Sequence, residues 1–274
     1  MSVVTLKTCR VVSGGRPVPA PFAPTGAHGK QPRKVSTMYP LNGAVVLVTG
    51  ANGGIGTQFV HSVLARGASK VYATARTPRS WDDERIVPLA LDITDPDSIQ
   101  AAVKAADDVT VLINNAGASV ATPGILTHSD AEIRNNVETN FLGPLFLARA
   151  FAPVLTAKEK SAMIDIHSAM SWYAVGGIYS ATKAALWSVT NSLRLELAPE
   201  GVHVVGVHVG YVDTSMAAHS TDPKMDPVDL VTTVLDAVEA GEYEVLADQT
   251  SVQLKAGLSA PIEAVYPQLA RSKS

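Results

Sequence analysis

Seven short apolar segments alternate with stretches of helical periodicity between residues 41 and 246. Uninterrupted apolar runs such as Val45–Val48 are typical of strands that are covered on both faces, as in a parallel sheet. The predicted strands are residues 45–48, 71–75, 86–91, 109–113, 162–166, 202–209 and 243–246. The predicted helices are residues 54–66, one beginning at Asp95-Pro96, and residues 132–155, 180–197 and 226–241. The helix over residues 132–155 is expected to be disturbed near Pro144 and Pro153. This alternation predicts an α/β fold with one doubly wound, Rossmann-type parallel sheet of about seven strands and helices on both faces, in a single domain.

The first forty residues differ in composition from the rest of the chain. They hold six basic residues, six prolines and no acidic residue, whereas the whole chain of 274 residues has a formal net charge of −3. Because proline interrupts helices, we predict a disordered basic leader over residues 1–40 and a folded domain over residues 41–274. Met38 as the functional start is one variant of this interpretation. An organelle transit peptide is an alternative, although the prolines would break its amphipathic helix.

Composition excludes several classes of partner. The 22 basic and 25 acidic residues leave no strong positive field, which argues against a nucleic-acid-binding protein. Cys9 is the only cysteine, so neither an internal disulfide nor a cysteine-based zinc site is expected. No apolar stretch is long enough to span a membrane, which needs about 20 residues. We therefore expect a cytoplasmic protein that acts on a small molecule.

A glycine-rich turn, Thr49–Gly56, follows the first predicted strand and opens the first helix. Gly50, Gly54 and Gly56 permit a tight turn and a close approach of the backbone to a pyrophosphate at the helix N-terminus. The spacing is G-x-x-x-G-x-G, so a turn that needs glycine only for its dihedral angles remains an alternative. Since ligands bind at the carboxyl ends of such strands, the strand–turn–helix context favours dinucleotide binding.

Two further predicted strand ends carry polar residues. Asp92 ends the third strand and could accept a hydrogen bond from an adenine amino group, or simply begin the next helix. Asn114-Asn115-Ala116-Gly117 ends the fourth strand, where adjacent amides could cross-link neighbouring strand ends beside a small-residue surface. A structural turn is an equal alternative for this second segment.

Tyr179 and Lys183 lie four residues apart in a predicted helix and therefore on one face of it. A phenol ionises near pH ~10, and a nearby ammonium group lowers that pKa, which suits tyrosine to general acid–base catalysis. Ser168, at the end of the fifth strand, could face this tyrosine and bind a substrate carbonyl. Asn140 lies inside the long preceding helix and could hold a water or a backbone group. Alone, the Tyr/Lys spacing would more often be a surface feature.

Taken together, these motifs resemble those of the short-chain dehydrogenase/reductase family, over about residues 41–250. The resemblance implies that Tyr179 is the general acid–base and that Lys183 holds the nicotinamide ribose and lowers the tyrosine pKa. It also implies that Ser168 orients the carbonyl and that Asn140 positions a water in a proton relay. The expected catalytic residues are thus Asn140, Ser168, Tyr179 and Lys183. The expected cofactor-binding residues are Gly50, Asn52, Gly53, Gly54, Ile55, Gly56, Arg76, Asp92, Ile93, Asn114, Ala116, Gly117, Tyr179, Lys183, Gly210, Val212 and Thr214. The expected substrate-pocket residues are Ser168, Met170, Trp172, Tyr173, Tyr179, Tyr211 and Met216. No metal is expected.

Three features depart from the family pattern. Ser168 and Tyr179 are 11 residues apart, so the loop between them is shorter than in most members. Val209-Gly210 stands in place of the usual Pro-Gly. The C-terminal Asp-Gly-Gly that often supports a tetramer is absent. The family's interface helices imply a homodimer, and the missing Asp-Gly-Gly makes a tetramer less expected. The apolar residues of these helices are Phe141, Leu145, Phe146, Leu186, Trp187 and Leu193.

The resulting hypothesis is an NAD(P)-dependent oxidoreductase for a carbonyl/alcohol pair. Ala75 stands where family members that use NAD carry an acid, and Arg76 follows it, so we expect NADP(H) to be preferred and NAD(H) to be possible. Gly53 replaces a basic residue that many NADP-using members carry, which weakens this preference. A dehydratase or epimerase, and a non-catalytic dinucleotide sensor, are the alternatives. We interpret His167, His203 and His208 as ordinary strand residues without a carboxylate partner.

Overall fold

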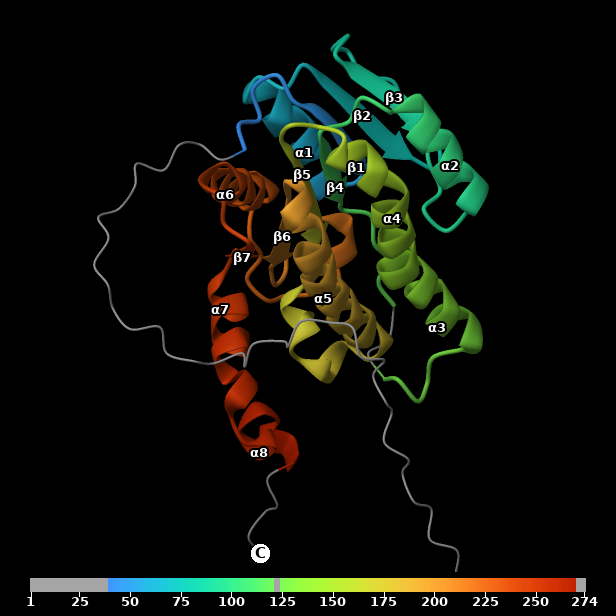
Figure 1. Ribbon diagram of the computed structural model, residues 1–274. Helices are drawn as coiled ribbons and strands as arrows, with labels where there is room; N and C mark the ends of the chain where they lie inside the picture. Colours follow the sequence, from blue (N-terminus) through green and yellow to red (C-terminus); the bar gives the residue numbers. More distant parts are fainter. Residues whose placement is uncertain (1–38, 121–123, 270–274) are drawn as a thin grey trace, which may run out of the picture. The chain divides into compact units, whose positions relative to one another are not determined.

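The computed structural model describes residues 39–120 and 124–269 of the chain. In this part of the chain, seven parallel strands form one sheet in the order β3-β2-β1-β4-β5-β6-β7 (Figure 1). The strands are β1 (Val45–Thr49), β2 (Lys70–Ala75), β3 (Ile86–Ala90), β4 (Val111–Asn114), β5 (Ser161–Ile166), β6 (Val202–His208) and β7 (Glu244–Leu246). The predicted doubly wound sheet is therefore confirmed. Its strand order reverses between β1 and β4, the place where ligands bind in such sheets.

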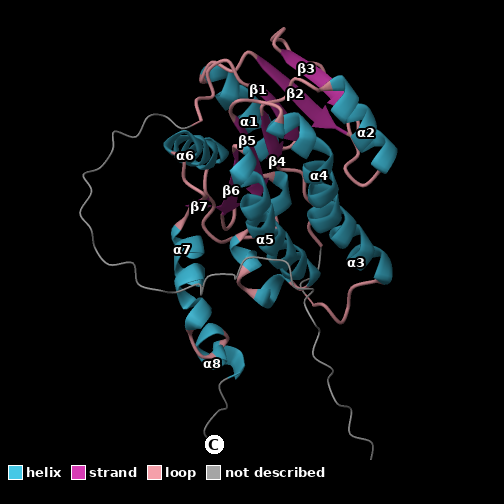
Figure 2. Cartoon of the chain, viewed as in Figure 1, coloured by secondary structure: helices cyan, strands magenta, loops and turns pink. Residues whose placement is uncertain are grey.

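The α-helices cover both faces of the sheet, as the cyan helices around the magenta strands in Figure 2 show. They are α1 (Gly54–Ala65), α2 (Pro96–Ala105), α3 (Asp130–Val137), α4 (Gly143–Thr156), α5 (Ile178–Leu197), α6 (Pro227–Ala240), α7 (Gln249–Ala256) and α8 (Ile262–Val265). Helices α1 and α6 share one apolar core with one face of the strands. Helices α2, α4 and α5 share a second core with the opposite face.

Strand side chains alternate between these two cores. On β5, Ile164 contributes to the core beneath α1 and α6, whereas Met163 contributes to the core beneath α4 and α5. The side chains of Asp165 and His167 therefore point toward α5, in line with Met163. This alternation places polar residues at the carboxyl end of the sheet directly under the helix that carries Tyr179.

Two predicted helices can be compared with the structure in detail. Asp95 caps α2 by accepting a hydrogen bond from the Asp97 backbone N–H. The helix expected over residues 132–155 consists of α3, a π-helical turn over Glu138–Leu142, and α4. The disturbance expected near Pro144 is thus a π turn that ends just before it. The predicted leader over residues 1–40 lies outside the described residues except for Tyr39 and Pro40.

Within the described ranges, no helix is both long and apolar enough to cross a membrane. The same ranges contain no group of three or more His, Cys, Asp or Glu side chains that could hold a metal ion.

Candidate active site

The glycine-rich turn is held closed by its own backbone and by Asn115. Gly50 has a φ of +67°, and a Cβ at Gly56 would lie 2.2 Å from the Gly50 carbonyl oxygen. Asn115 donates from Nδ2 to the Thr49 carbonyl at 2.8 Å, and its backbone N–H donates to Thr49 Oγ1 at 2.9 Å. Of the two adjacent amides expected to cross-link strand ends, Asn115 thus joins the ends of β1 and β4.

The turn and the start of α1 fit a bound diphosphate. The N-cap residue of α1 is Gly53, which has no side chain to accept from the first helical N–H groups, and the first turn carries no acidic residue. These N–H groups and the positive end of the helix dipole favour an anion. A Cβ at Gly54 would lie 2.8 Å from Thr214 Cγ2, so a larger residue there would displace the Thr214 side chain in the loop after β6.

Asn114 points into the protein. Its Nδ2 donates to Asp165 Oδ1 at 2.8 Å, and its Oδ1 is buried without a hydrogen-bond partner among the described residues. Beside it, the backbone N–H of Ala116 donates to Thr49 Oγ1 at 2.9 Å. The side chain of Asn114 thus links β4 to β5, while the backbone after it lines the carboxyl edge of the sheet.

Asn140 fixes the loop that follows β4. It lies fully buried in the π turn, where its Oδ1 accepts from the Ala118 N–H at 2.8 Å and its Nδ2 donates to the Ala118 carbonyl at 2.8 Å. Its Nδ2 also lies 3.0 Å from Asn136 Oδ1 and 3.4 Å from Thr182 Oγ1. π turns are frequent at functional sites because the extra residue redirects side chains.

Lys183 reaches the same point from α5. Its ammonium group donates to the Ile166 carbonyl at 2.8 Å. A Cβ built on Gly117 would lie 3.8 Å from Lys183 Nζ and 3.3 Å from Asn140 Oδ1, so β4, the π turn and α5 meet at this glycine. Burial lowers the pKa of Lys183 to about 8, and a negative charge on the neighbouring Asp165 acts in the opposite direction.

Tyr179 lies in the first turn of α5, and its ring centroid is 5.9 Å from Lys183 Nζ. Burial raises the pKa of Tyr179, while its hydrogen bond with Ser168 acts in the opposite direction. The net direction differs from the lowering that the Tyr/Lys pair suggested, because burial has the larger effect. Ser168 Oγ accepts from the Met170 N–H at 3.1 Å, which leaves the serine hydrogen available to donate.

The loop after β6 forms the opposite side of this region. Gly210 donates its N–H to Asp248 Oδ2 at 2.6 Å, and Asp248 also caps α7. Val212 is buried and pairs with Met225 in an isolated parallel bridge. Asp248, which sequence reasoning did not single out, therefore holds the position of Gly210.

The expected substrate-pocket residues separate into two groups. Trp172 is buried, stacks on His208 at 3.9 Å between ring centroids and packs edge-on against Trp187, so the structure favours a packing role for it over the expected role in the pocket. Four other expected pocket residues are partly or largely exposed: Met170, Tyr173, Tyr211 and Met216.

The C-terminal segment fastens the loop between Ser168 and Tyr179. The Tyr266 ring stacks on Tyr173 at 5.3 Å between centroids, and the Tyr266 hydroxyl accepts from the Ala174 N–H at 3.0 Å. Sequence reasoning missed Tyr266 because it lies about ninety positions beyond the loop and follows no motif.

The loops after β2 and β3 carry the residues expected at the adenosine end. Arg76 is exposed, and its charge contributes to lowering the pKa of Asp92. The larger causes of that lowering are the hydrogen bonds that Asp92 accepts from Thr94. Asn52 donates to the Thr77 carbonyl at 2.9 Å, which joins the glycine-rich turn to the loop after Arg76. Ile93 is buried in the core beneath α4, and Ile55 packs on the core beneath α6.

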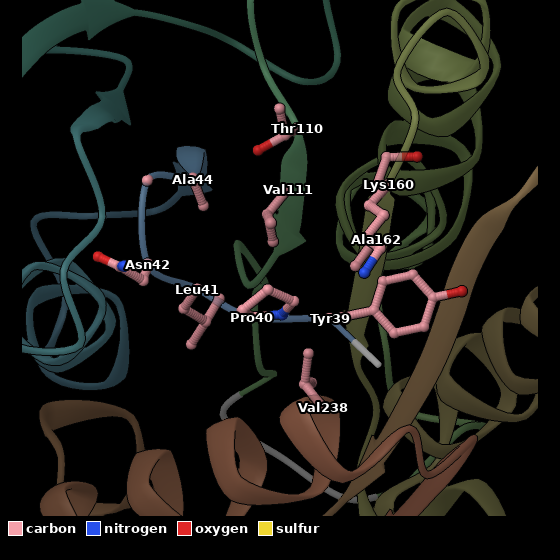
Figure 3. Close-up of a pocket in the computed structure, with 12 residues that line it drawn as sticks. Tyr39, Pro40, Leu41, Asn42, Ala44, Thr110, Val111, Lys160, Ala162 and Val238 are labelled. Carbon is pink, nitrogen blue, oxygen red and sulfur yellow. The ribbon is translucent and has the colours of Figure 1, made fainter. Parts of the chain in front are cut away.

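Two surface hollows lie away from these residues. One of about 210 Å³ lies at the amino ends of β1, β4 and β5, where Tyr39, Leu41 and Val111 contribute to its wall (Figure 3). The other, of about 610 Å³, is lined by residues of the loop after β2, including Arg79 and Trp81. Neither hollow is lined by an expected catalytic residue.

One sequence interpretation requires correction. His167 follows β5 and His208 ends β6, as expected. Contrary to expectation, each has a carboxylate near it. His208 Nε2 lies 3.8 Å from Glu244 Oε1. His167 is linked to Asp165 through the Thr190 hydroxyl. These contacts depend on the pairing of distant segments, which the local spacing of histidines does not reveal.

Comparisons with known proteins agree with this arrangement. Residues 44–224 match the family model described as short chain dehydrogenase. The chain is 29% identical, over 77% of its length and 93% of the relative's, to the NADP-dependent 3-hydroxy acid dehydrogenase of Schizosaccharomyces pombe. A short-chain dehydrogenase from Burkholderia cenocepacia, solved in complex with NADP, is 35% identical with a TM-score of 0.78, over 84% of this chain and 99% of that one. The NADPH-bound carbonyl reductase from chicken fatty liver is 29% identical with a TM-score of 0.67, over 72% of this chain and 92% of that one.

Proposed function

Because the chain belongs to the short-chain dehydrogenase family, we propose that it is an oxidoreductase that interconverts a carbonyl compound and an alcohol with NADP(H). One observation supports this most directly. Residues from separate stretches of sequence, Asn140, Lys183 and the backbone at Gly117, converge at the carboxyl end of the sheet, with Tyr179 and Ser168 beside them.

The residues have distinct roles in the proposed reaction. Ser168 and Tyr179 hold the substrate oxygen between their hydroxyl groups, and Tyr179 donates its proton to that oxygen during reduction. Lys183 places a positive charge near the phenolate that forms. Asn140 keeps the loop at Ala118 in place through two hydrogen bonds to its backbone. The bound nicotinamide cofactor supplies the hydride.

Preference for NADP(H) is supported by the end of β2. Ala75 offers no carboxylate that would repel a 2′-phosphate, and the exposed Arg76 can pair with that phosphate. The relatives from Schizosaccharomyces pombe, Burkholderia cenocepacia and chicken are described with NADP or NADPH. NAD(H) use remains part of the proposal, since Gly53 provides no second positive charge.

Tyr179→Phe tests the proposal. Purified protein is first assayed for oxidation of NADPH and of NADH with a panel of aldehydes and ketones. With the best substrate, we expect the variant to lose turnover by about 10²- to 10⁴-fold, because the proton donor is removed, while NADPH binding by fluorescence titration stays nearly unchanged.

Tyr243→Phe is the matched control, since Tyr243 is half exposed at the start of β7, away from the site. It should keep the wild-type rate. Turnover of Tyr179→Phe at the wild-type level would refute the assignment of the general acid.

A further inference from the structure

A row of polar side chains lies buried between the sheet and α5, outside the residues assigned to the reaction. It comprises Asp165 and His167 at the end of β5, His208 on β6 and Thr190 on α5, all at most 2% exposed. The four side chains are connected. Thr190 Oγ1 lies 2.7 Å from Asp165 Oδ2 and 2.8 Å from His167 Nε2, and His167 Nδ1 lies 3.1 Å from His208 Nε2.

The surrounding structure is shaped to hold this row. Gly206, on β6, leaves room for an imidazole, since a Cβ there would lie 2.8 Å from His167 Cε1. Asn114 donates to the second oxygen of Asp165 at 2.8 Å. Trp172 stacks on the outer face of the His208 ring. Solvent is therefore kept away from a set of groups that bond to one another.

The hydrogen at the His208 end is fixed by its surroundings. His208 Nδ1 lies 3.2 Å from the Ser168 carbonyl oxygen, which can only accept, so Nδ1 carries a hydrogen. Burial lowers the pKa of His208 to about 3 and lowers that of His167 well below its ordinary value. Both rings are therefore neutral near pH 7, and Nε2 of His208 has no hydrogen.

The remaining hydrogens follow in sequence. His167 Nδ1 must donate to the bare Nε2 of His208, which leaves His167 Nε2 as an acceptor for the Thr190 hydroxyl. That hydroxyl has one hydrogen, so it cannot also donate to Asp165 Oδ2 or to the Leu186 carbonyl oxygen, which lies 2.9 Å away. The short contact between Thr190 and Asp165 then requires a protonated Asp165 that donates to Thr190. Burial raises the pKa of Asp165, in agreement with this arrangement.

A second arrangement uses the same number of protons. Asp165 gives its proton to Thr190, Thr190 gives its own to His167 Nε2, and His167 gives its Nδ1 proton to His208 Nε2. Asp165 becomes a carboxylate and His208 an imidazolium, with Glu244 3.8 Å away. Every hydrogen bond persists with donor and acceptor exchanged, so no heavy atom needs to move.

The charged groups around the row oppose each other. At the inner end, the charges of Lys183 and Arg194 on α5 favour the Asp165 carboxylate, whereas burial disfavours it. At the outer end, the same two side chains and Lys255 on α7 disfavour a charged His208. Glu244 on β7 faces both His208 and Lys255 and favours the imidazolium. The second arrangement thus places a negative charge on Asp165, beside Lys183, and a positive charge on His208.

We propose that Asp165, Thr190, His167 and His208 form a buried proton relay, and that Asp165 is a positioning residue for Lys183. When the proton moves to His208, the new carboxylate stabilises the Lys183 ammonium, the form that supports proton donation by Tyr179. The benefit to turnover rests on the proposed function, whereas the relay itself is a property of the folded chain.

Two substitutions at Thr190 separate the relay from packing. Thr190→Val keeps the size and removes the hydroxyl, whereas Thr190→Ser keeps the hydroxyl and removes a methyl group. The relay predicts that the valine variant loses about tenfold or more in kcat, with the KM for NADPH unchanged, and that the serine variant retains kcat. A packing role predicts the reverse order and would overturn the proposal.

Asp165→Asn supplies a pH readout. An amide can keep hydrogen bonds to Asn114 and Thr190 but cannot become a carboxylate, so it mimics the first arrangement. We expect the alkaline fall of kcat, which reports the complex in which the carboxylate forms during turnover, to move to lower pH than in the wild type. An unchanged pH profile would mean that Asp165 does not act on Lys183.

Nitrogen NMR of the histidine rings tests the relay without any assay. In the full-length wild type and in Thr190→Ser, His167 and His208 should both be neutral with the hydrogen on Nδ1, and Thr190→Val should alter His167. Infrared spectra should show a protonated carboxyl band at pH 7 that disappears in Asp165→Asn. Nε2-protonated rings, or no such band, would refute the relay. If these spectra agree but no carbonyl compound is reduced, only the proposed function fails.

Discussion

Burial lowers the pKa of Lys183 to about 8, so this side chain begins to lose its charge within the usual range of assay pH. Burial also raises the pKa of Tyr179, which therefore keeps its proton over the same range. The proposed reduction needs both the lysine ammonium and the tyrosine proton. We expect kcat/KM to fall as the pH rises through about 8, as a result of Lys183 deprotonation.

A pH profile of kcat/KM with saturating NADPH checks this expectation. Lys183→Arg provides the comparison, because arginine stays charged over the whole range. Any activity that it retains should lack the fall near pH 8. A wild-type profile that stays flat up to pH ~10, where a phenol ionises, would assign the limit to Tyr179 instead.

Arg76 is the residue that we expect to favour NADPH over NADH. Its exposed guanidinium follows Ala75, and we expect it to pair with the 2′-phosphate of NADPH. Arg76→Ala should raise the KM for NADPH by about one to two orders of magnitude and barely change that for NADH, given the usual strength of hydrogen bonds to charged groups.

Arg79→Ala is a matched control for Arg76. Arg79 is also exposed, but its guanidinium lies 4.0 Å from the Trp81 ring centroid and 3.3 Å from Thr57 Oγ1. We expect a smaller effect on the KM for NADPH. Equal losses with both cofactors in Arg76→Ala, or a wild type that prefers NADH, would contradict the proposed preference.

The sequence predicted which single residues belong to the site better than it predicted their contacts. The spacing of Tyr179 and Lys183 was enough to place both on one helical face. The neighbours of Asn114 and His208 were not predictable, because they depend on the register between strands that are far apart in the chain. The direction of the Tyr179 pKa shift was likewise missed, since burial is a property of the folded chain.

Among the elements, the π turn over Glu138–Leu142 has the clearest consequence for the site. Asn140 within it satisfies both backbone groups of Ala118. Asn140→Asp keeps the acceptor but replaces the Nδ2 donor by an oxygen that faces other oxygens. We expect a loss of about 1–3 kcal/mol in the free energy of unfolding and at least a tenfold loss in kcat.

Denaturant unfolding and steady-state kinetics on the same preparations measure both effects. Asn135→Asp is the control, because Asn135 is exposed on α3, outside the π turn. It should match the wild type in both measurements. A fully active and stable Asn140→Asp protein would show that the loop at Ala118 does not need this side chain.

Element boundaries were predictable where a local signal marks them. Asp95-Pro96 marked the start of α2, and Gly241 the end of α6. Helices α7 and α8 were not predicted, because their short segments show little apolar periodicity and are largely exposed. The π turn was expected only as a disturbance near Pro144, since no residue pattern distinguishes it from a kink.

For the whole molecule, we expect a homodimer formed through α4 and α5, as the family resemblance implies. Of the apolar residues expected there, Leu186 and Leu193 lie on the buried face of α5 and cannot contact a second subunit. Phe146 is 37% exposed. Leu195, on α5, is 79% exposed and adds to this surface. Phe146→Glu should therefore shift the protein from dimer to monomer in light scattering at micromolar concentration.

Leu126→Glu is the control for this experiment. Leu126 is 97% exposed, but it lies in the loop before α3 and outside α4 and α5. Its variant should remain dimeric. A monomeric wild type at micromolar concentration would contradict the expected assembly.

The overall fold was predictable because a single pattern, the alternation of apolar strands and helices, runs from residue 41 to residue 246. Each strand buried on both faces needs helices above and below it, which leaves few arrangements. The two faces are chemically different near the carboxyl edge. The α1 and α6 side is apolar there, whereas the α5 side contains the row around Asp165.

The contact between Gly206 and His167 also limits which substitutions can be accepted at these two positions. A side chain at residue 206 would lie 2.8 Å from the imidazole, so the two positions cannot vary independently. Gly206→Ala should be damaging alone and better tolerated beside a smaller residue at 167, which is the pattern of epistasis. We therefore expect a protein with histidine at 167 and alanine at 206 to be less stable than one with glycine at 206.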